Sequence, residues 1–334
     1  MNINLCMKGC RILKTTTNSA ELDEKKVKAR KKKSNLNADS WQLGVMQSIG
    51  LIHVFIFCYI PMFGIIIAFK KYRFNLGIFD SPWCGLENFE YMFKSDVFVR
   101  LIRNTVGYNV VWIILGIVFS IMVALFMENV HNNKLAIKVF QSAAFLPKFL
   151  SWVVVSYISY TFLSLDTGFL NKIITMFGGQ KISFYSETKY WPAILTVFNL
   201  WKGFGTSSLI YYGSMMSIDT ELYEAASLDG CTYFKRIWNI TLPHLRPTIV
   251  MLLILSVGGI FRSDFGLFYY LPQDNGALYN VTDVLDTYIT RALRVSGELG
   301  MASAASFLQS VVGFVLVVTT NKIVSKLDSE SSLF

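Results

Sequence analysis

The chain has 334 residues, 53% of them hydrophobic, and a mean hydropathy of +0.44, which excludes an ordinary soluble domain. A net charge of +9 would suit nucleic acid, but much of it lies in the first 33 residues and near the ends of apolar runs, as expected for contact with anionic lipid. The five cysteines are scattered and predict neither a disulfide framework nor a metal site.

The N-terminal region, residues 1–44, is polar and basic. Its densest cluster of positive charge consists of Lys25, Lys26, Lys28, Arg30, Lys31, Lys32 and Lys33. No apolar run precedes this cluster, so we expect no cleavable signal peptide. We interpret residues 1–44 as a cytoplasmic tail held near anionic lipid headgroups rather than as a nucleic-acid-binding segment.

Six apolar runs of about 20 residues follow, and each is long enough to cross a hydrocarbon core about 30 Å thick. They lie at residues 47–69, 104–127, 139–165, 192–216, 247–271 and 300–321. The sequence therefore predicts an all-α membrane protein with six transmembrane helices within residues 45–325. An even number of spans puts both termini on one side, and the basic cluster places that side in the cytoplasm.

This topology assigns the remaining segments to the two sides of the membrane. Residues 128–138, residues 217–246 and a short tail at 326–334 are expected in the cytoplasm, and the other loops outside. Lys70 and Lys71 follow the first span on the predicted outer side, which reduces the excess of positive charge on the cytoplasmic side relative to the outer side. We expect the larger cluster before that span to dominate, so the cell membrane holds a multi-pass protein with cytoplasmic termini.

Residues 217–246 form a polar island between two apolar runs and are predicted to fold as two short helices with a turn between them. Asp219 can cap the first helix, and Glu221 and Glu224 lie early in it, where the helix dipole favours negative charge. Gly230 is expected to end that helix in a left-handed conformation, which glycine adopts without steric cost.

The second helix of this island is expected to begin after Thr232 and to end at Pro243. The spacing across the island resembles the signature of ABC importer permeases, in which Glu-Ala-Ala is followed at fixed offsets by Gly, Ile and Leu-Pro. The matching positions are Glu224, Ala225, Ala226, Gly230, Ile240, Leu242 and Pro243. In that family the segment is a cytoplasmic coupling helix seated in a groove of the ATPase subunit. The resemblance implies a set of ATPase-coupling residues: Glu221, Glu224, Ala225, Ala226, Asp229, Gly230, Leu242 and Pro243.

Shorter motifs indicate which group within this family the chain resembles. Gly85-Leu-Glu-Asn-Phe89 and then Arg103-Asn-Thr105 resemble a pair of motifs in carbohydrate permeases. The stretches 165–171 and 261–269 resemble the LplB-like group, the permeases for oligosaccharides and polysaccharide fragments. The resemblance implies a type I ABC importer permease fold and four kinds of partner: a second related permease, two ATPase subunits that use ATP and Mg, an extracytoplasmic solute-binding protein, and membrane lipid.

Polar and aromatic residues within the predicted spans are candidates for the substrate pathway, because polar groups that face lipid are costly. Aromatic rings beside polar side chains also suit the C–H faces and hydroxyl groups of sugars, although a ring can equally be a core residue or an interface anchor. The candidates are Asn199, Trp201, Lys202, Tyr211, Phe261, Arg262 and Asp264. Arg262 and Asp264 would pair only if their helix unwinds locally. Lys148 is interpreted as reaching the cytoplasmic interface.

The chain has no Gly-x-x-x-x-Gly-Lys-Ser/Thr phosphate loop, no His-Glu-x-x-His and no Gly-x-Ser-x-Gly motif. We therefore expect no enzymatic activity and no cofactor on this chain, with ATP hydrolysed by a separate subunit. An ABC permease for a non-sugar solute and an ion-gradient-driven secondary transporter remain as alternatives. The second would favour an inverted repeat and acidic residues at mid-membrane, where we find only Asp264.

Overall fold

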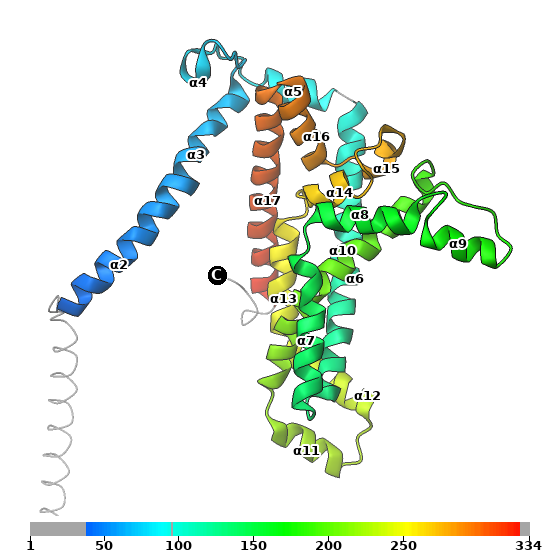
Figure 1. Ribbon diagram of the computed structural model, residues 1–334. Coiled ribbons are helices and arrows are strands. Elements are labelled where there is room, and N and C mark those ends of the chain that lie inside the picture. The colour runs from blue at the N-terminus through cyan, green and yellow to red at the C-terminus, as the bar shows by residue number, and fades with distance from the viewer. Residues whose placement is uncertain (1–37, 95, 328–334) are drawn as a thin grey trace, which may run out of the picture. The chain divides into compact units, whose positions relative to one another are not determined.

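A computed structural model describes residues 38–94 and 96–327 of the chain (Figure 1). Within these ranges the chain is almost entirely helical and contains no named β-strand. It divides into two compact units, Met1–Gly64 and Ile65–Phe334. The basic cluster that the topology prediction depends on lies outside the described residues, as does the C-terminal tail beyond Leu327.

The first unit contributes an apolar helical run. It consists of α2 (Ala38–Val54), a π turn (Phe55–Tyr59), α3 (Ile60–Met62) and the start of a 3₁₀ turn (Phe63–Phe69). Most large apolar side chains of this run are exposed, as expected for a helix that faces lipid. Pro61, which has no backbone N–H to donate, follows the π turn and does not end the helix.

The second unit is a set of helices joined by short turns. Its α-helices are α4 (Gly77–Asp80), α5 (Glu87–Phe93), α6 (Asp96–Val130), α7 (Lys134–Phe149), α8 (Trp152–Leu163), α9 (Phe169–Met176), α10 (Trp191–Met216), α11 (Thr220–Leu228), α12 (Tyr233–Arg236), α13 (Leu242–Gly258), α14 (Phe265–Tyr270), α15 (Tyr279–Thr282), α16 (Leu285–Arg291) and α17 (Leu299–Leu327). Its 3₁₀ and π turns after α9 are Thr188–Tyr190, Ile237–Thr241, Gly276–Leu278 and Ala292–Ser296. In Figure 1 helices α6, α7, α10, α13 and α17 run side by side, and α8 and α9 turn away from them.

Small residues let these long helices pack closely. A Cβ at Gly205 of α10 would lie 2.0 Å from the carbonyl oxygen of Ala144 in α7. A Cβ at Gly313 of α17 would lie 2.7 Å from the carbonyl oxygen of Gly258 in α13. Such backbone-to-backbone approach is typical of helix pairs within membranes, where dispersion contacts rather than exclusion of water drive association.

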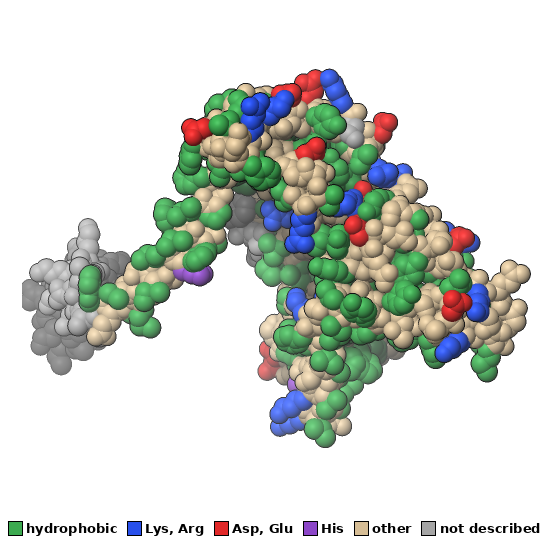
Figure 2. Space-filling model, turned by 45° about the horizontal axis from the view of Figure 1, so that its top comes forward, with side chains coloured by type: hydrophobic (Ala, Val, Ile, Leu, Met, Phe, Trp, Pro, Cys, Tyr) green, Lys and Arg blue, Asp and Glu red, His purple; other side chains and the backbone are tan. Residues whose placement is uncertain are grey.

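The number of membrane spans differs from the prediction. Among the described residues, four helical runs are long and apolar enough to cross a membrane: Trp41–Phe69, Asp96–Val130, Tyr233–Gly258 and Leu299–Lys326. The pair α7 and α8 makes a fifth only if it is one broken span, since its two helices are bent by 97°. Figure 2 shows hydrophobic side chains over much of the visible surface, as lipid contact requires. The predicted count of six spans is not confirmed, although each predicted run contains a helix.

The predicted span 139–165 is wrong as a single straight helix. Pro147 lies in the last turn of α7, and Leu150 and Ser151 are extended. The Oγ of Ser151 then accepts a hydrogen bond from the backbone N–H of Val154 at 3.3 Å, which caps α8. A proline and a capping serine therefore explain the bend.

The predicted span 247–271 is also wrong in its bounds. The corresponding helix begins at Tyr233 and ends at Gly258. Residues 259–264 leave the helix, and α14 follows as a separate short helix capped by Asp264. Pro247, the first residue of the predicted run, lies inside α13. The break places Arg262 and Asp264 on irregular backbone.

The Asn-Thr motif near the start of α6 holds the segment between α15 and α16. The Nδ2 of Asn104 donates to the carbonyl oxygens of Asn280 at 3.1 Å and Asp283 at 2.9 Å. The Oγ1 of Thr105 accepts from the backbone N–H of Leu285 at 3.0 Å. These buried bonds satisfy backbone groups that have no helical partner, so the motif has a structural role in this chain.

Candidate functional site

The segment predicted to couple to an ATPase lies at the end of the helix bundle away from α14, α15 and α16 (Figure 1). The Oδ1 of Asp219 accepts from the backbone N–H of Glu221 at 3.0 Å, which confirms the predicted cap of α11. Gly230 has a φ of +69°, which confirms the predicted left-handed end. Thr232 occupies the capping position of α12 without a side-chain hydrogen bond.

The surface of α11 is open. Of the predicted coupling residues on it and in the following turn, five are exposed: Glu221, Glu224, Ala225, Asp229 and Gly230. Ala226 is half-buried. Large apolar side chains beside them are also exposed, Leu228 at 90% and Phe234 at 72%. Carboxylates, small residues and apolar side chains thus share one exposed surface, as expected of a protein-contacting segment.

Pro243 does not end the second helix, contrary to the prediction. Helix α12, the π turn Ile237–Thr241 and α13 form one continuous run, with Leu242 and Pro243 in the first turn of α13. The π turn before Pro243 shifts the backbone hydrogen-bond pattern by one residue, so the missing N–H of this proline does not interrupt the run. The coupling segment therefore continues without interruption into a candidate membrane span.

Two side-chain contacts brace this segment. The hydroxyl of Tyr223 on α11 lies 3.0 Å from the Oγ1 of Thr241. Burial raises the pKa of the Tyr223 hydroxyl, so it remains protonated at neutral pH. The Nδ2 of Asn129, at the end of α6, donates to the hydroxyl of Tyr233 at 2.6 Å. The segment is thus tied both to the start of α13 and to α6.

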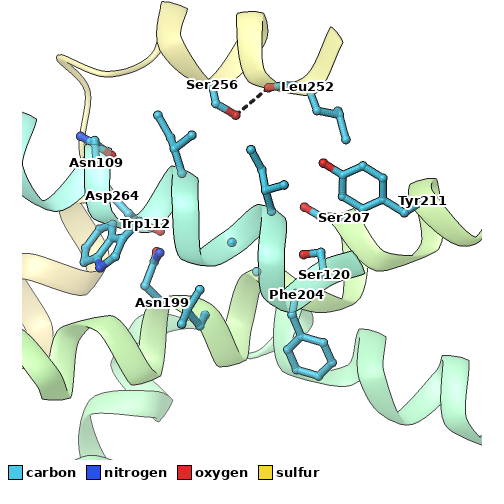
Figure 3. Close-up of a pocket in the computed structure, with 15 residues that line it drawn as sticks. Asn109, Trp112, Ser120, Asn199, Phe204, Ser207, Tyr211, Leu252, Ser256 and Asp264 are labelled. Atoms are coloured by element: carbon cyan, nitrogen blue, oxygen red, sulfur yellow. Dashed lines mark hydrogen bonds between the residues drawn. The ribbon is translucent and has the colours of Figure 1, made fainter. Parts of the chain in front are cut away.

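A cavity of about 360 Å³ lies between α6, α10 and α13 (Figure 3). Hydroxyl and amide groups line it, from Asn109, Ser120, Asn199, Ser207, Tyr211 and Ser256. Apolar side chains, including Trp112, Phe204 and Leu252, complete the wall, and Asp264 adds a carboxylate. In Figure 3 Asn109, Trp112 and Asp264 lie at one end of the cavity, and Ser207 and Tyr211 at the other. Such a wall suits a ligand that presents both hydroxyl groups and C–H surface.

Three of the predicted pathway residues, Asn199, Tyr211 and Asp264, line this cavity. Trp201 and Phe261 pack against buried apolar clusters instead. Lys202 places its ammonium 3.9 Å from the centre of the Trp152 ring. The structure therefore brings together part of the predicted set in one cavity, and a pathway role for every member of the set stays a prediction.

Arg262 and Asp264 do not pair, although the backbone between α13 and α14 has unwound. The Nη2 of Arg262 donates to the Oγ of Ser310 on α17 at 3.3 Å. The Oδ2 of Asp264 accepts from the Nε1 of Trp152 at 2.7 Å, and its Oδ1 accepts from the backbone N–H of Gly266 at 2.9 Å. Asp264 therefore joins α8, α14 and the wall of the cavity.

Asn109 is a site residue that sequence analysis missed. Its Nδ2 donates to the carbonyl oxygens of Ile260 and Arg262, both at 2.9 Å, and its side chain lines the cavity. It satisfies carbonyl groups that the break between α13 and α14 leaves without helical partners. A polar residue within an apolar run was the available signal, by the reasoning applied to Asn199.

No group of three or more His, Cys, Asp and Glu side chains in the described part of the chain is arranged to hold a metal ion.

Comparison with known proteins identifies the family. Residues 116–327 match the family described as the binding-protein-dependent transport system inner membrane component. This range contains the candidate coupling segment and all of the cavity lining except Asn109, Trp112 and Ile113.

Two relatives that align with most of the chain support the same family assignment. Over 295 residues the chain is 33% identical to Protein LplB of Bacillus subtilis (strain 168), covering 88% of this chain and 92% of LplB. Over 281 residues it is 33% identical to the polygalacturonan/rhamnogalacturonan transport system permease protein YteP of the same organism, covering 84% of this chain and 87% of YteP.

A solved structure shows the same fold. A chain from a bacterial ABC transporter involved in the import of the acidic polysaccharide alginate matches with a TM-score of 0.78 and 32% identity, covering 87% of this chain and 97% of that chain. A second structure, of the bacterial alginate ABC transporter in complex with its alginate pentasaccharide-bound periplasmic protein, matches with a TM-score of 0.77. These matches exclude the alternative of an ion-gradient-driven secondary transporter. The chain belongs to the inner membrane components of binding-protein-dependent transport systems, as a multi-pass permease subunit of an ABC importer and not an enzyme.

Proposed function

We propose that this permease imports oligosaccharides or polysaccharide fragments and forms half of their translocation pathway. The cavity between α6, α10 and α13 carries the proposal, because it combines hydroxyl and amide groups with aromatic and aliphatic surface. Sugars present the complementary pattern, hydroxyl groups around a C–H face. The saccharides named for YteP and for the alginate importer support the same class of substrate.

The arrangement of the chain explains how a separate ATPase would drive transport. Helix α10 leads into α11, and α12 leads from α11 into α13. Asn199 and Tyr211 of α10 and Ser256 of α13 all line the cavity. A displacement of α11 would therefore reach two walls of the cavity, α10 through the short connection 217–219 and α13 through the continuous run from α12. The Asn129–Tyr233 hydrogen bond would carry it to the third wall, α6.

The complete transporter in this proposal contains further chains. A second related permease supplies the other half of the pathway, and two ATPase subunits bind the coupling segments and use ATP and Mg. The solute-binding protein delivers substrate on the opposite side, so α11 and both termini lie in the cytoplasm. Exposed carboxylates and small residues on α11 support its assignment as the ATPase contact.

Three substitutions in the coupling segment test this assignment in the reconstituted transporter. Gly230→Val forces a branched residue into a left-handed conformation at a cost of about 1 kcal/mol or more. Ala226→Leu overpacks a half-buried contact by about 1–3 kcal/mol, and Glu224→Ala removes an exposed carboxylate. Each variant should lose uptake of a labelled oligosaccharide, while the binding protein still binds that oligosaccharide. The ATPase should co-purify less firmly or lose its stimulation by the loaded binding protein.

Glu187→Ala, an exposed carboxylate between α9 and α10, is the matched control and should transport normally. Normal uptake, ATPase association and stimulation in all three coupling variants would contradict the assignment. Import of a peptide or another non-sugar solute, without import of any oligosaccharide, would contradict the proposed substrate class.

A further inference from the structure

We propose that Lys148 and Lys202 form a binding site for the carboxylate of an acidic sugar residue at the edge of the cavity. This inference rests on the proposed import of oligosaccharides and adds that the imported oligosaccharide contains uronic acid. The site lies where the end of α7 and the start of α8 meet α10 and the break between α13 and α14.

Lys202 is held in place by its neighbours. Its Nζ lies 3.9 Å from the centre of the Trp152 ring, a cation–π contact. The ring itself is fixed, because its Nε1 donates to the Oδ2 of Asp264 at 2.7 Å and Gly266 packs against it. A Cβ at Gly266 would lie 2.0 Å from the Cδ1 of Trp152. The residue is half-buried, and the contact with Trp152 positions its ammonium before any ligand arrives.

Lys148 provides the second charge. It is exposed in the last turn of α7, about 21 Å along the helix axis from Lys134 at 1.5 Å per residue. Lys134 begins α7 at the end of the bundle that holds the coupling segment (Figure 1). Lys148 therefore lies far from that end, and in the proposed orientation, with the coupling segment in the cytoplasm, it is not at the cytoplasmic interface. Gly205, one turn after Lys202, packs against the backbone of Ala144 and Phe145, one turn before Lys148, so the antiparallel helices α7 and α10 bring the two lysines to the same level.

The two ammonium groups lack a matching anion. Neither lysine forms an ion pair with a residue that the structure describes. Asp264 is bonded to the same Trp152, but its oxygens already accept hydrogen bonds from that indole and from the first turn of α14. Two neighbouring cations with one shared carboxylate leave a net positive charge, and a ligand carboxylate would relieve their repulsion through charge-assisted hydrogen bonds.

The lysine pair adjoins the wall that would bind the rest of a sugar. Asp264 both contacts Trp152 and lines the cavity, so Trp152 and Asp264 connect Lys202 to the cavity wall. The neutral polar groups of the wall, such as Asn199 and Ser256, are suited to sugar hydroxyl groups. A neutral oligosaccharide would use only the wall, whereas a uronate-containing one would also use the lysines. The pair would therefore select for the acidic substrate.

Two forms of one probe test this inference. Tetragalacturonate and its fully methyl-esterified form share a backbone and differ in charge. Their equilibrium binding is measured on the purified permease–ATPase complex in phosphatidylcholine nanodiscs, with the binding protein left out so that its own selectivity does not enter. The unmodified complex should bind the acid about tenfold more tightly than the ester, the ratio expected of one charge-assisted hydrogen bond.

Substitutions test whether the two lysines cause the preference for the acid over the ester. Lys148→Gln and Lys202→Gln should each reduce the preference for the acid to about twofold or less and leave binding of the ester unchanged. Lys202→Arg keeps the charge over Trp152 and should retain the preference, as should Lys138→Gln, an exposed lysine elsewhere on α7. Unchanged thermal unfolding verifies that each variant is folded.

Several outcomes would overturn the inference: equal binding of acid and ester by the unmodified complex, binding of neither, or a preference that survives both glutamine substitutions. Nanodiscs that contain anionic lipid test the other source of negative charge. If such lipid stabilises the complex only when both lysines are present and the preference for the acid does not depend on them, the pair binds a lipid headgroup instead. Uptake of neutral oligosaccharides without any preference would refute this inference and leave the proposed function standing, whereas no uptake of any oligosaccharide would refute the proposed function.

Discussion

Asp283 shows how single buried charges organise the segment between α14 and α17. Its side chain is 3% exposed and accepts hydrogen bonds from Arg291 and, at 3.4 Å, from the Nη2 of Arg100 on α6. Arg291 also pairs with Asp274 at 2.9 Å. A buried carboxylate costs several kcal/mol unless it is paired, so one acid between two arginines fixes α16 against α6.

Asp286, on α16, leads to a prediction about how stability depends on pH. Burial raises the pKa of its carboxyl, against the opposing effects of the Ser263 N–H and Gln309. Because the folded pKa lies above the unfolded one, the folded state retains the proton between the two values, and stability falls as pH rises through that interval. Asp286→Asn removes this titration, and its side-chain oxygen can keep both hydrogen bonds, which go to one oxygen of Asp286.

The unfolding temperature of the Asp286→Asn variant, relative to the parent, should therefore increase as pH rises from about 4, the ordinary pKa of aspartate, toward neutrality. Thermal unfolding of the purified complex in detergent measures this difference. A difference that stays constant with pH, or that changes in the parent's favour, would contradict the raised pKa.

At the scale of elements, the sequence predicted helix ends that depend on neighbouring residues. It did not predict a helix break that depends on residues far away in the chain. The helix cap at Asp219 and the left-handed helix end at Gly230 were predicted from residue type and spacing alone, and both are confirmed. The break between α13 and α14 was missed because the run 247–271 is apolar on both sides of Arg262-Ser-Asp264, and these polar residues were interpreted as part of one span. What permits the break lies elsewhere in the chain: Asn109, and the Nε2 of Gln309, which donates to the carbonyl oxygen of Phe261 at 2.7 Å. A single-sequence pattern does not report such distant partners.

Two prolines within helical runs are each accommodated by a preceding π turn. Pro61 and Pro243 each lie two residues after a π turn, which ends at Tyr59 in the first case and at Thr241 in the second. Sequence reasoning treated Pro243 as a helix end because proline lacks a backbone N–H. The structure keeps the helix by inserting one extra residue into the preceding turn, a change that residue type alone does not reveal.

The packing of α10 on α7 gives a second prediction. Gly205→Ala would put a Cβ 2.0 Å from the backbone oxygen of Ala144, and backbone cannot move aside as a flexible side chain can. We expect the substitution to destabilise the purified complex by about 1–3 kcal/mol and to lower its unfolding temperature. Gly213→Ala is the matched control, since it lies on the same helix with nothing within 4 Å of the added Cβ. Equal effects of the two substitutions would show that helix propensity, rather than the close approach, determines the result.

At the scale of the whole molecule, the helix that contributes most polar side chains to the cavity is the one that a hydropathy test omits. Helix α10 has 26 residues but is not among the candidate spans of the described chain. It contributes Asn199, Ser207 and Tyr211 to the cavity. A helix with one polar side has a lower mean hydropathy, so a hydropathy test passes over such a helix even where it crosses a membrane.

The orientation of the whole molecule gives the last prediction. If α11 contacts an ATPase, it lies in the cytoplasm, and the loop between α9 and α10 lies on the opposite side. Ser227 of α11 and Gln180 of that loop are both exposed, so a cysteine at either position should react with a thiol reagent that reaches it. The background is a variant in which the chain's own cysteines, Cys6, Cys10, Cys58, Cys84 and Cys231, are replaced by serine.

In intact cells a membrane-impermeant maleimide should label the Gln180→Cys variant and not the Ser227→Cys variant. In inside-out vesicles the result should reverse, because the vesicles expose the cytoplasmic side. The unlabelled background chain sets the baseline, and uptake by each variant verifies that the transporter is intact. Labelling of Ser227→Cys from outside the cell would place α11 away from ATP. That result would contradict the coupling role and the cytoplasmic termini together, since both follow from the same parity of spans.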